Sequence, residues 1–241
     1  MGAANGEIGT VQRIAELAAV TRGSGVPLHV DGVSALGRVP LAAETAGIDL
    51  LTVSGNDIYG PPGTGALWVR PGLALAPLIL GGEEEGGHRA GTQSVAALVG
   101  LGVAAELMRA EGQHGEPARL ARLRDRLAEG LAAEVPQCRV TGSRAARLPH
   151  HLSVIVRGAK ADGLLLDLDQ VGIAASTGTA CAAAARSSHV LRAIGCGDEE
   201  VDGSLCFTLG RWSSDADVDA VIRHLPGIVA RQRAGAGARP A

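Results

Sequence analysis

The chain has 241 residues, of which 46% are hydrophobic and 20% charged, and its formal net charge is −3. This balance lacks the basic footprint of a nucleic-acid-binding protein, and no apolar run reaches the roughly 20 residues of a membrane span. The four cysteines form neither a disulfide framework nor a metal-binding pair. We therefore expect a cytoplasmic protein in a reducing compartment, with no metal site and with neither nucleic acid nor membrane as a partner.

The first part of the chain alternates helical and extended patterns. Val11, Ile14, Leu17 and Ala18 recur at helical spacing, and glycines end this pattern after Arg22. The expected elements are a helix at 9–22, a strand at 26–30, a helix at 41–46, a strand at 49–53, a Gly/Pro loop at 54–65 and a strand at 66–70. Strands that alternate with helices favour an α/β sheet whose loops gather at one edge.

A change of composition near Gly112 separates this region from the rest of the chain. The elements expected around and after it are a loop at 79–92, helices at 94–111 and 120–127, a strand at 152–156, a helix at 164–169, a loop at 172–187, a helix at 190–194, a strand at 205–209 and a helix at 216–229. We therefore expect a large domain over residues 1–112, a smaller α+β domain over 113–232 and a disordered tail over 233–241.

Two residues and one loop could carry chemistry. Asp31 ends a predicted strand, where α/β sheets hold ligands, although residue type alone favours an N-cap or turn aspartate. The loop at 54–65 has the glycines and hydroxyls of an anion cradle, but it matches no phosphate-binding motif, and its composition alone favours a plain turn. Cys181 stands among small and hydroxylated residues, as an accessible sulfur nucleophile would, and an inert cysteine is the alternative. For the other three cysteines we expect the inert role, and we expect the pair His150-His151 to lie at the surface.

Eight short segments follow one another at the spacing of a known family. They are NGEIGTVQ at 5–12, HVD at 29–31, SG at 54–55, IYGP at 58–61, RAGT at 89–92, ASTGTAC at 175–181, VLRAIG at 190–195 and FTLGR at 207–211. In these segments the chain resembles the C-terminal three-fifths of a NifS/IscS-type cysteine desulfurase, a class V pyridoxal-phosphate (PLP) enzyme of fold type I. The resemblance implies an α/β fold, with the C-terminal part of the PLP-binding large domain followed by a smaller α+β domain.

The resemblance also implies roles for four residues of this chain. Asp31 matches the aspartate that holds the pyridine nitrogen of PLP, and Ser54 matches a serine that binds the cofactor phosphate. Thr92 matches a threonine that reaches the phosphate across the dimer interface. Cys181 matches the loop cysteine that carries sulfur as a persulfide.

The chain departs from the family at several of these positions. Asn56-Asp57 stand where the family has His-Lys, so Asp57 replaces the lysine that forms the Schiff base. Lys160 is the only lysine of the chain, and it precedes the helix predicted at 164–169. Gly6, Ser34 and Cys206 replace an asparagine and a glutamine that contact the cofactor and an arginine that pairs with the substrate carboxylate.

The family implies conversion of L-cysteine to L-alanine, with the sulfur passed to an acceptor protein, in a homodimer or a heterodimer. The missing lysine argues against turnover by this chain alone, so an altered or assisted desulfurase is the first hypothesis. An inactive relative that binds a partner or relays sulfur is the second. A gene product that folds poorly is the third.

Overall fold

The computed structural model describes residues 1–178 and 188–237, which form two compact units. The first unit contains Met1–Ala3 and Gln12–His114, and the second contains Ala4–Val11 and Gly115–Ala241. The change of unit after His114 lies two residues beyond the expected boundary. The sequence did not indicate that residues 4–11 belong with the second half of the chain, where Leu148 N donates to Gly9 O at 2.8 Å.

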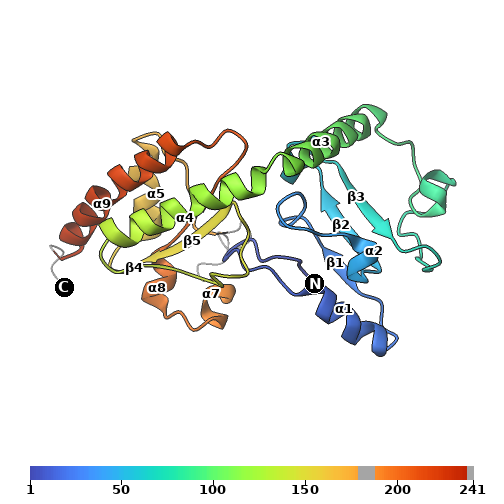
Figure 1. Ribbon diagram of the computed structural model, residues 1–241, viewed down its shortest axis with the longest axis horizontal. Coiled ribbons are helices and arrows are strands. Elements are labelled where there is room, and N and C mark those ends of the chain that lie inside the picture. Colours follow the sequence, from blue (N-terminus) through green and yellow to red (C-terminus); the bar gives the residue numbers. More distant parts are fainter. Residues whose placement is uncertain (179–187, 238–241) are drawn as a thin grey trace. The chain divides into compact units, whose positions relative to one another are not determined.

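A three-stranded sheet organises the first unit. Its elements are α1 (Ile14–Gly23), β1 (His29–Asp31), α2 (Ala43–Ala46), β2 (Leu50–Ser54), the 3-10 turn η1 (Asn56–Ile58), β3 (Gly65–Val69), the 3-10 turn η2 (Glu84–Gly87) and α3 (Val95–Gln113). The strand order is β1-β2-β3, with β1 parallel and β3 antiparallel to β2 (Figure 1). The chain start covers the other side of β1, where Asp31 N donates to Met1 O at 2.8 Å and Ala3 N donates to Asp31 O at 2.7 Å.

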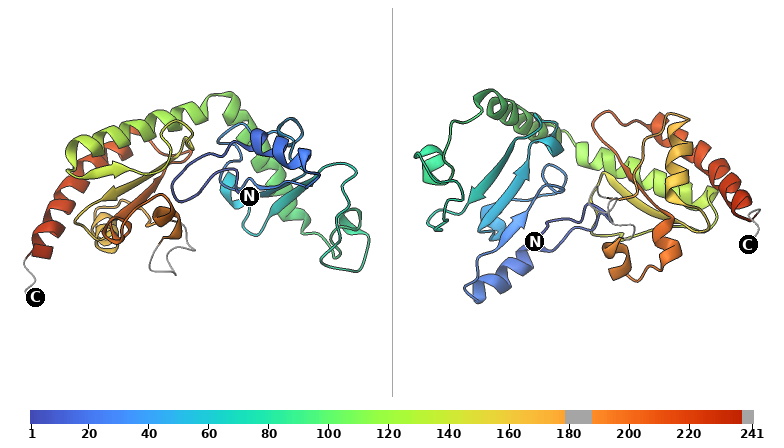
Figure 2. Two further views of the ribbon diagram at one scale, coloured as in Figure 1. Left: turned by 90° about the horizontal axis from the view of Figure 1, so that it is seen from below. Right: turned by 180° about the vertical axis from the view of Figure 1, so that it is seen from behind.

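The second unit packs helices on both faces of an antiparallel sheet. Its elements are α4 (Glu116–Glu134), β4 (Cys138–Val140), β5 (His151–Val156), α5 (Ala161–Asp169), α7 (His189–Ala193), α8 (Asp198–Asp202), β6 (Ser204–Thr208) and α9 (Asp215–Gly237). The strand order is β4-β5-β6. Helices α4 and α9 run side by side, as the views in Figure 2 and their contacts agree.

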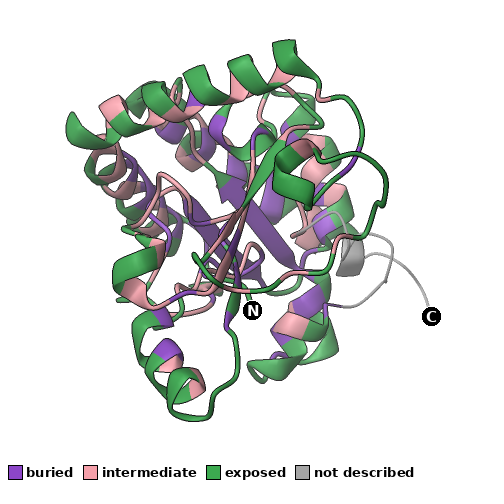
Figure 3. Ribbon diagram, turned by 90° about the vertical axis from the view of Figure 1, so that its right-hand side faces the viewer, coloured by how far each residue is buried: buried purple, intermediate pink, exposed green. Residues whose placement is uncertain are grey.

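All six residues of the central strand β5 are buried, because side chains alternate between two covered faces. Leu152, Val154 and Val156 join the core made by α4, α5 and α9. Ile155 points to the opposite face and joins Ile8 in a second cluster with α7 and α8. Figure 3 shows this burial concentrated on the strands, with exposed helix surfaces around them.

Most expected elements are confirmed within a few residues, and three differences have local causes. The short strand β4 and the short helix α8 were not expected, since neither is long enough to show a periodic pattern. The tail prediction is wrong for residues 233–237, because α9 continues to Gly237. Arg233 anchors that extension by donating to Pro136 O at 2.8 Å and to Arg157 O at 2.6 Å. Residues 238–241 lie outside the described part of the chain.

Candidate functional site

Asp31 and Ser54 lie at the carboxyl ends of two adjacent parallel strands. In the register of β1 and β2, Asp31 faces Thr52, so Ser54 stands two residues further along β2. This edge of a parallel pair is where α/β sheets hold ligands. The structure therefore brings together two of the predicted cofactor contacts. Asp31 Oδ1 also accepts a hydrogen bond from Val33 N at 2.9 Å, so the turn explanation of this aspartate holds as well.

The loop after Ser54 is a tight 3-10 turn that carries Asp57. Ile58 is buried beneath it, whereas Asp57 is exposed. Gly55 N donates to Thr64 O at 2.9 Å, and Gly60 N donates to Gly55 O at 2.7 Å. These bonds close the loop on itself and hold Asp57 in the turn that directly follows Ser54.

Thr92 lies apart from this edge. It is exposed in the segment between η2 and α3, which Figure 1 shows extending beyond β3, the strand at the other side of the sheet from β1. Within its own unit the structure does not bring Thr92 to Asp31 and Ser54. Its contact across a dimer interface stays a prediction.

Cys181 lies outside the described residues, but the start of its loop is held in the second unit. Ser176 forms a bridge with β6, in which Ser176 N donates to Cys206 O at 3.0 Å and Cys206 N donates to Ser176 O at 2.7 Å. Cys206 therefore lies directly beside the strand-like stretch that leads to Cys181.

The side chain of Cys206 is buried beside His151. Its Sγ lies 3.0 Å from Nε2 of His151, and burial raises the pKa of the thiol to about 11. Burial lowers the pKa of His151 to about 4. His151 Nε2 also lies 2.9 Å from Gly6 O, and because a carbonyl can only accept, Nε2 carries the hydrogen. At neutral pH neither side chain is charged, so nothing in this pair replaces the positive charge of the family's arginine.

Two buried groups here were missed or misjudged from the sequence, His151 of this pair and Glu7 near it. His151 is only 2% exposed, so the expectation of a surface pair at His150-His151 is wrong for this residue. Glu7 is 4% exposed, and its Oε1 has no hydrogen-bond partner among the described residues. The signal for Glu7 was its place inside the NGEIG segment, whereas nothing local to His151 marked it as buried.

No described helix has the length and apolar content needed to cross a bilayer. Among the described residues, no group of three or more His, Cys, Asp or Glu side chains could hold a metal ion.

Comparison with known proteins agrees with this architecture. A family model described as aminotransferase class-V matches residues 1–221. The chain is 44% identical over 231 residues to cysteine desulfurase IscS 1 of Archaeoglobus fulgidus, which covers 95% of this chain and 60% of the relative. It is 44% identical over 234 residues to a cysteine desulfurase of Nostoc, which covers 96% of this chain and 58% of the relative.

The solved structures point the same way. A NifS-like protein from Rickettsia africae matches with a TM-score of 0.85 and 30% identity, over 94% of this chain and 60% of that one. The chain thus spans about 60% of the length of these relatives. It belongs to the class V aminotransferase family, whose members are PLP-dependent, and it is a homologue of the cysteine desulfurases within it.

Proposed function

We propose that this chain carries sulfur as a persulfide on Cys181 and passes it to an acceptor protein, without converting L-cysteine to L-alanine by itself. The observation that carries the proposal is that Asp57 replaces the lysine of the family. Asp57 occupies the exposed turn after Ser54, at the position where the family has its lysine.

The residues of this chain fit PLP only in part. Asp31 and Ser54 could contact a pyridine nitrogen and a phosphate at the edge of β1 and β2. The first unit has no lysine to accompany them, because the single lysine of the chain, Lys160, belongs to the second unit, where it precedes the first turn of α5. The negative charge of Asp57 in that turn also opposes an anionic cofactor. The site therefore does not fit a covalently attached cofactor, and we derive no step through one.

The chain also lacks the family's residue for binding the substrate carboxylate. In the family an arginine pairs with the substrate carboxylate, and the matching residue here is the neutral thiol of Cys206. Loss of a bidentate arginine–carboxylate contact costs about 2–4 kcal/mol of binding. Loss of a well-placed nucleophile and base costs about 100-fold to 10,000-fold each in rate. Together these losses favour a carrier over an independent enzyme.

Sulfur transfer to Cys181 needs neither the lysine nor the arginine. The Cys181 thiolate would attack the outer sulfur of a persulfide on a donor protein, the donor's S–S bond would break, and the donor would leave as a thiolate. Atoms and electrons balance without an added oxidant. The donor would be an active desulfurase bound as a partner, and the acceptor a protein thiol. We place this exchange in the cytoplasm, where thiols stay reduced.

A second candidate is desulfuration of L-cysteine by an assisted route, in which a further chain in a homodimer or heterodimer supplies the missing groups. The meeting of Asp31 and Ser54 at one sheet edge favours it, since a pure carrier has no need of either residue.

One experiment separates the two candidates. The purified chain is incubated with L-cysteine and PLP, with and without an active cysteine desulfurase, and both alanine and sulfur-modified protein are measured. The carrier predicts no alanine from the chain alone. It also predicts, when the donor is present, a mass gain of one sulfur atom that is lost in Cys181→Ala and retained in Cys138→Ala. Alanine from the chain alone that depends on Asp31 and Cys181 would refute the carrier and establish the homodimer form of the second candidate.

A further inference from the structure

A cavity of about 260 Å³ opens in the second unit between α4 and the strands β4 and β5. It shares no residue with the edge that carries Asp31 and Ser54, because all of its lining lies between residues 124 and 154. Four of the lining residues are arginines, namely Arg124, Arg139, Arg144 and Arg147. Guanidinium groups gathered around one cavity favour the binding of an anion, unless carboxylates of the chain already neutralise them.

Two of the four arginines are already neutralised by carboxylates. Arg124 contacts Asp125 at 2.7 Å, and Arg139 contacts Glu200 at 3.0 Å. Within the described part of the chain, Arg144 makes no ion pair or hydrogen bond. Its exposed guanidinium is therefore available to a ligand at the cavity.

Arg147 is held in place but not neutralised. Its guanidinium donates to three backbone carbonyls, those of Ser143, Thr141 and His151. Burial lowers the pKa of Arg147, and the charge of Arg124 lowers it further. A half-buried cation beside other cations, with no carboxylate paired to it among the described residues, gains free energy from an anion bound nearby.

Besides the arginines, the lining has two carboxylates, Asp125 and Glu129, and an otherwise apolar wall. The surface of α4 contributes Ala128 and Ala132, and β4 contributes Cys138 and Val140. Burial raises the pKa of the Cys138 thiol to about 11, so this side chain adds no charge. The cavity therefore combines an apolar wall with a cationic side, and it is larger than an inorganic ion needs.

We propose that this cavity binds a small phosphate monoester, with the phosphate against Arg144 and Arg147 and the organic part against Ala128 and Ala132. A dianionic phosphate matches two unneutralised arginines, and guanidinium groups bind phosphate oxygens in a bidentate way. Glu129 also lines the cavity and weakens the binding by repulsion. This site goes beyond the proposed sulfur transfer and uses none of its residues.

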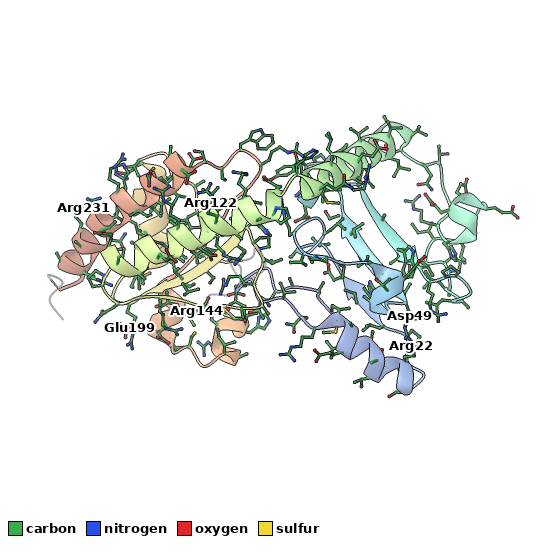
Figure 4. The ribbon with its side chains drawn as sticks, viewed as in Figure 1. Arg22, Asp49, Arg122, Arg144, Glu199 and Arg231 are labelled. Atoms are coloured by element: carbon green, nitrogen blue, oxygen red, sulfur yellow. The ribbon has the colours of Figure 1, made fainter. Side chains whose placement is uncertain are left out.

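The test is calorimetric titration of the full chain with phenyl phosphate. Arg144→Ala should weaken binding about tenfold, because one charge-assisted contact is lost. The matched control is Arg231→Ala, since Arg231 is also an exposed arginine of this unit with no ion pair to a described residue, but it lies on α9 away from the cavity (Figure 4). Glu129→Gln should tighten binding by about threefold, since a like charge is removed.

A second pair of variants tests the apolar wall. Ala132→Leu fills the cavity and should abolish binding, whereas Ala133→Leu, on the same helix but not in the lining, should leave it unchanged. Each variant's melting curve confirms its fold. Absence of saturable binding to the unchanged chain would overturn the proposal. Equal losses in Arg144→Ala and Arg231→Ala would also overturn it, since the attraction would then be diffuse.

Discussion

We predict that the folded protein loses stability in mild acid because His151 is buried in its neutral form. Its ring is buried and neutral, with Nε2 bonded to Gly6 O, and burial lowers its pKa from the usual 6.5 to about 4. In the unfolded chain the same imidazole binds a proton near its usual pKa. Below that pKa the unfolded state therefore holds more protons than the folded state, and stability falls as the pH falls. The loss begins near 6.5 and is complete once the pH has dropped below about 4.

The size of the effect follows from these two values. Each unit between the folded and unfolded pKa is worth about 1.4 kcal/mol, so moving from neutral pH to about pH 5 should cost about 2 kcal/mol. The measurement is urea unfolding at both pH values, followed by circular dichroism. His151→Asn removes the titrating group and should flatten the pH dependence by that amount. The control Leu164→Ala changes a buried side chain of the same unit that does not titrate and should leave the pH dependence as it is. Equal pH dependence in the unchanged chain and in His151→Asn would refute the reasoning.

Two further predictions concern packing. A Cβ on Gly55 would overlap Thr64 Oγ1 and lie 3.2 Å from Thr64 O, so Gly55→Ala should destabilise the first unit by about 1–3 kcal/mol in urea unfolding. Gly102→Ala, in an open position of α3, should instead stabilise it by up to about 1 kcal/mol, and the same sign for both variants would contradict this reasoning. Leu164 is fully buried in the core of the second unit, and Leu164→Ala should cost about 2–5 kcal/mol of unfolding free energy. Leu166→Ala, at a 68% exposed position of the same helix, should change it by less than about 0.5 kcal/mol, and a comparable loss at both sites would show that burial does not decide the cost.

The sequence predicted the helices and strands whose own residues show a recognisable pattern. The helix at 216–229 and the strand at 152–156 are long enough for their periodicity to be visible, and the structure places α9 and β5 there. Strand β4 has only three residues, and it forms because Val140 and its neighbours pair with β5. Such a strand depends on its partner and has no signature of its own.

The sequence by itself determined which residues are available for chemistry. Asp57 in place of a lysine, the single Lys160 and the position of Cys181 can all be read from the chain without coordinates. The α/β alternation indicated a sheet with its loops at one edge, and the parallel pairing of β1 and β2 places Asp31 and Ser54 at such an edge.

Only the tertiary structure decided which side chains are buried and which charged groups surround them. His151 is buried because residues 4–11 join the second unit, and its hydrogen bond to Gly6 spans 145 positions of the chain. The cavity at Arg144 and Arg147 likewise needs a helix, a strand and a loop to meet. Burial and electrostatic environment are sums over distant parts of the chain, and for that reason no local pattern predicts them.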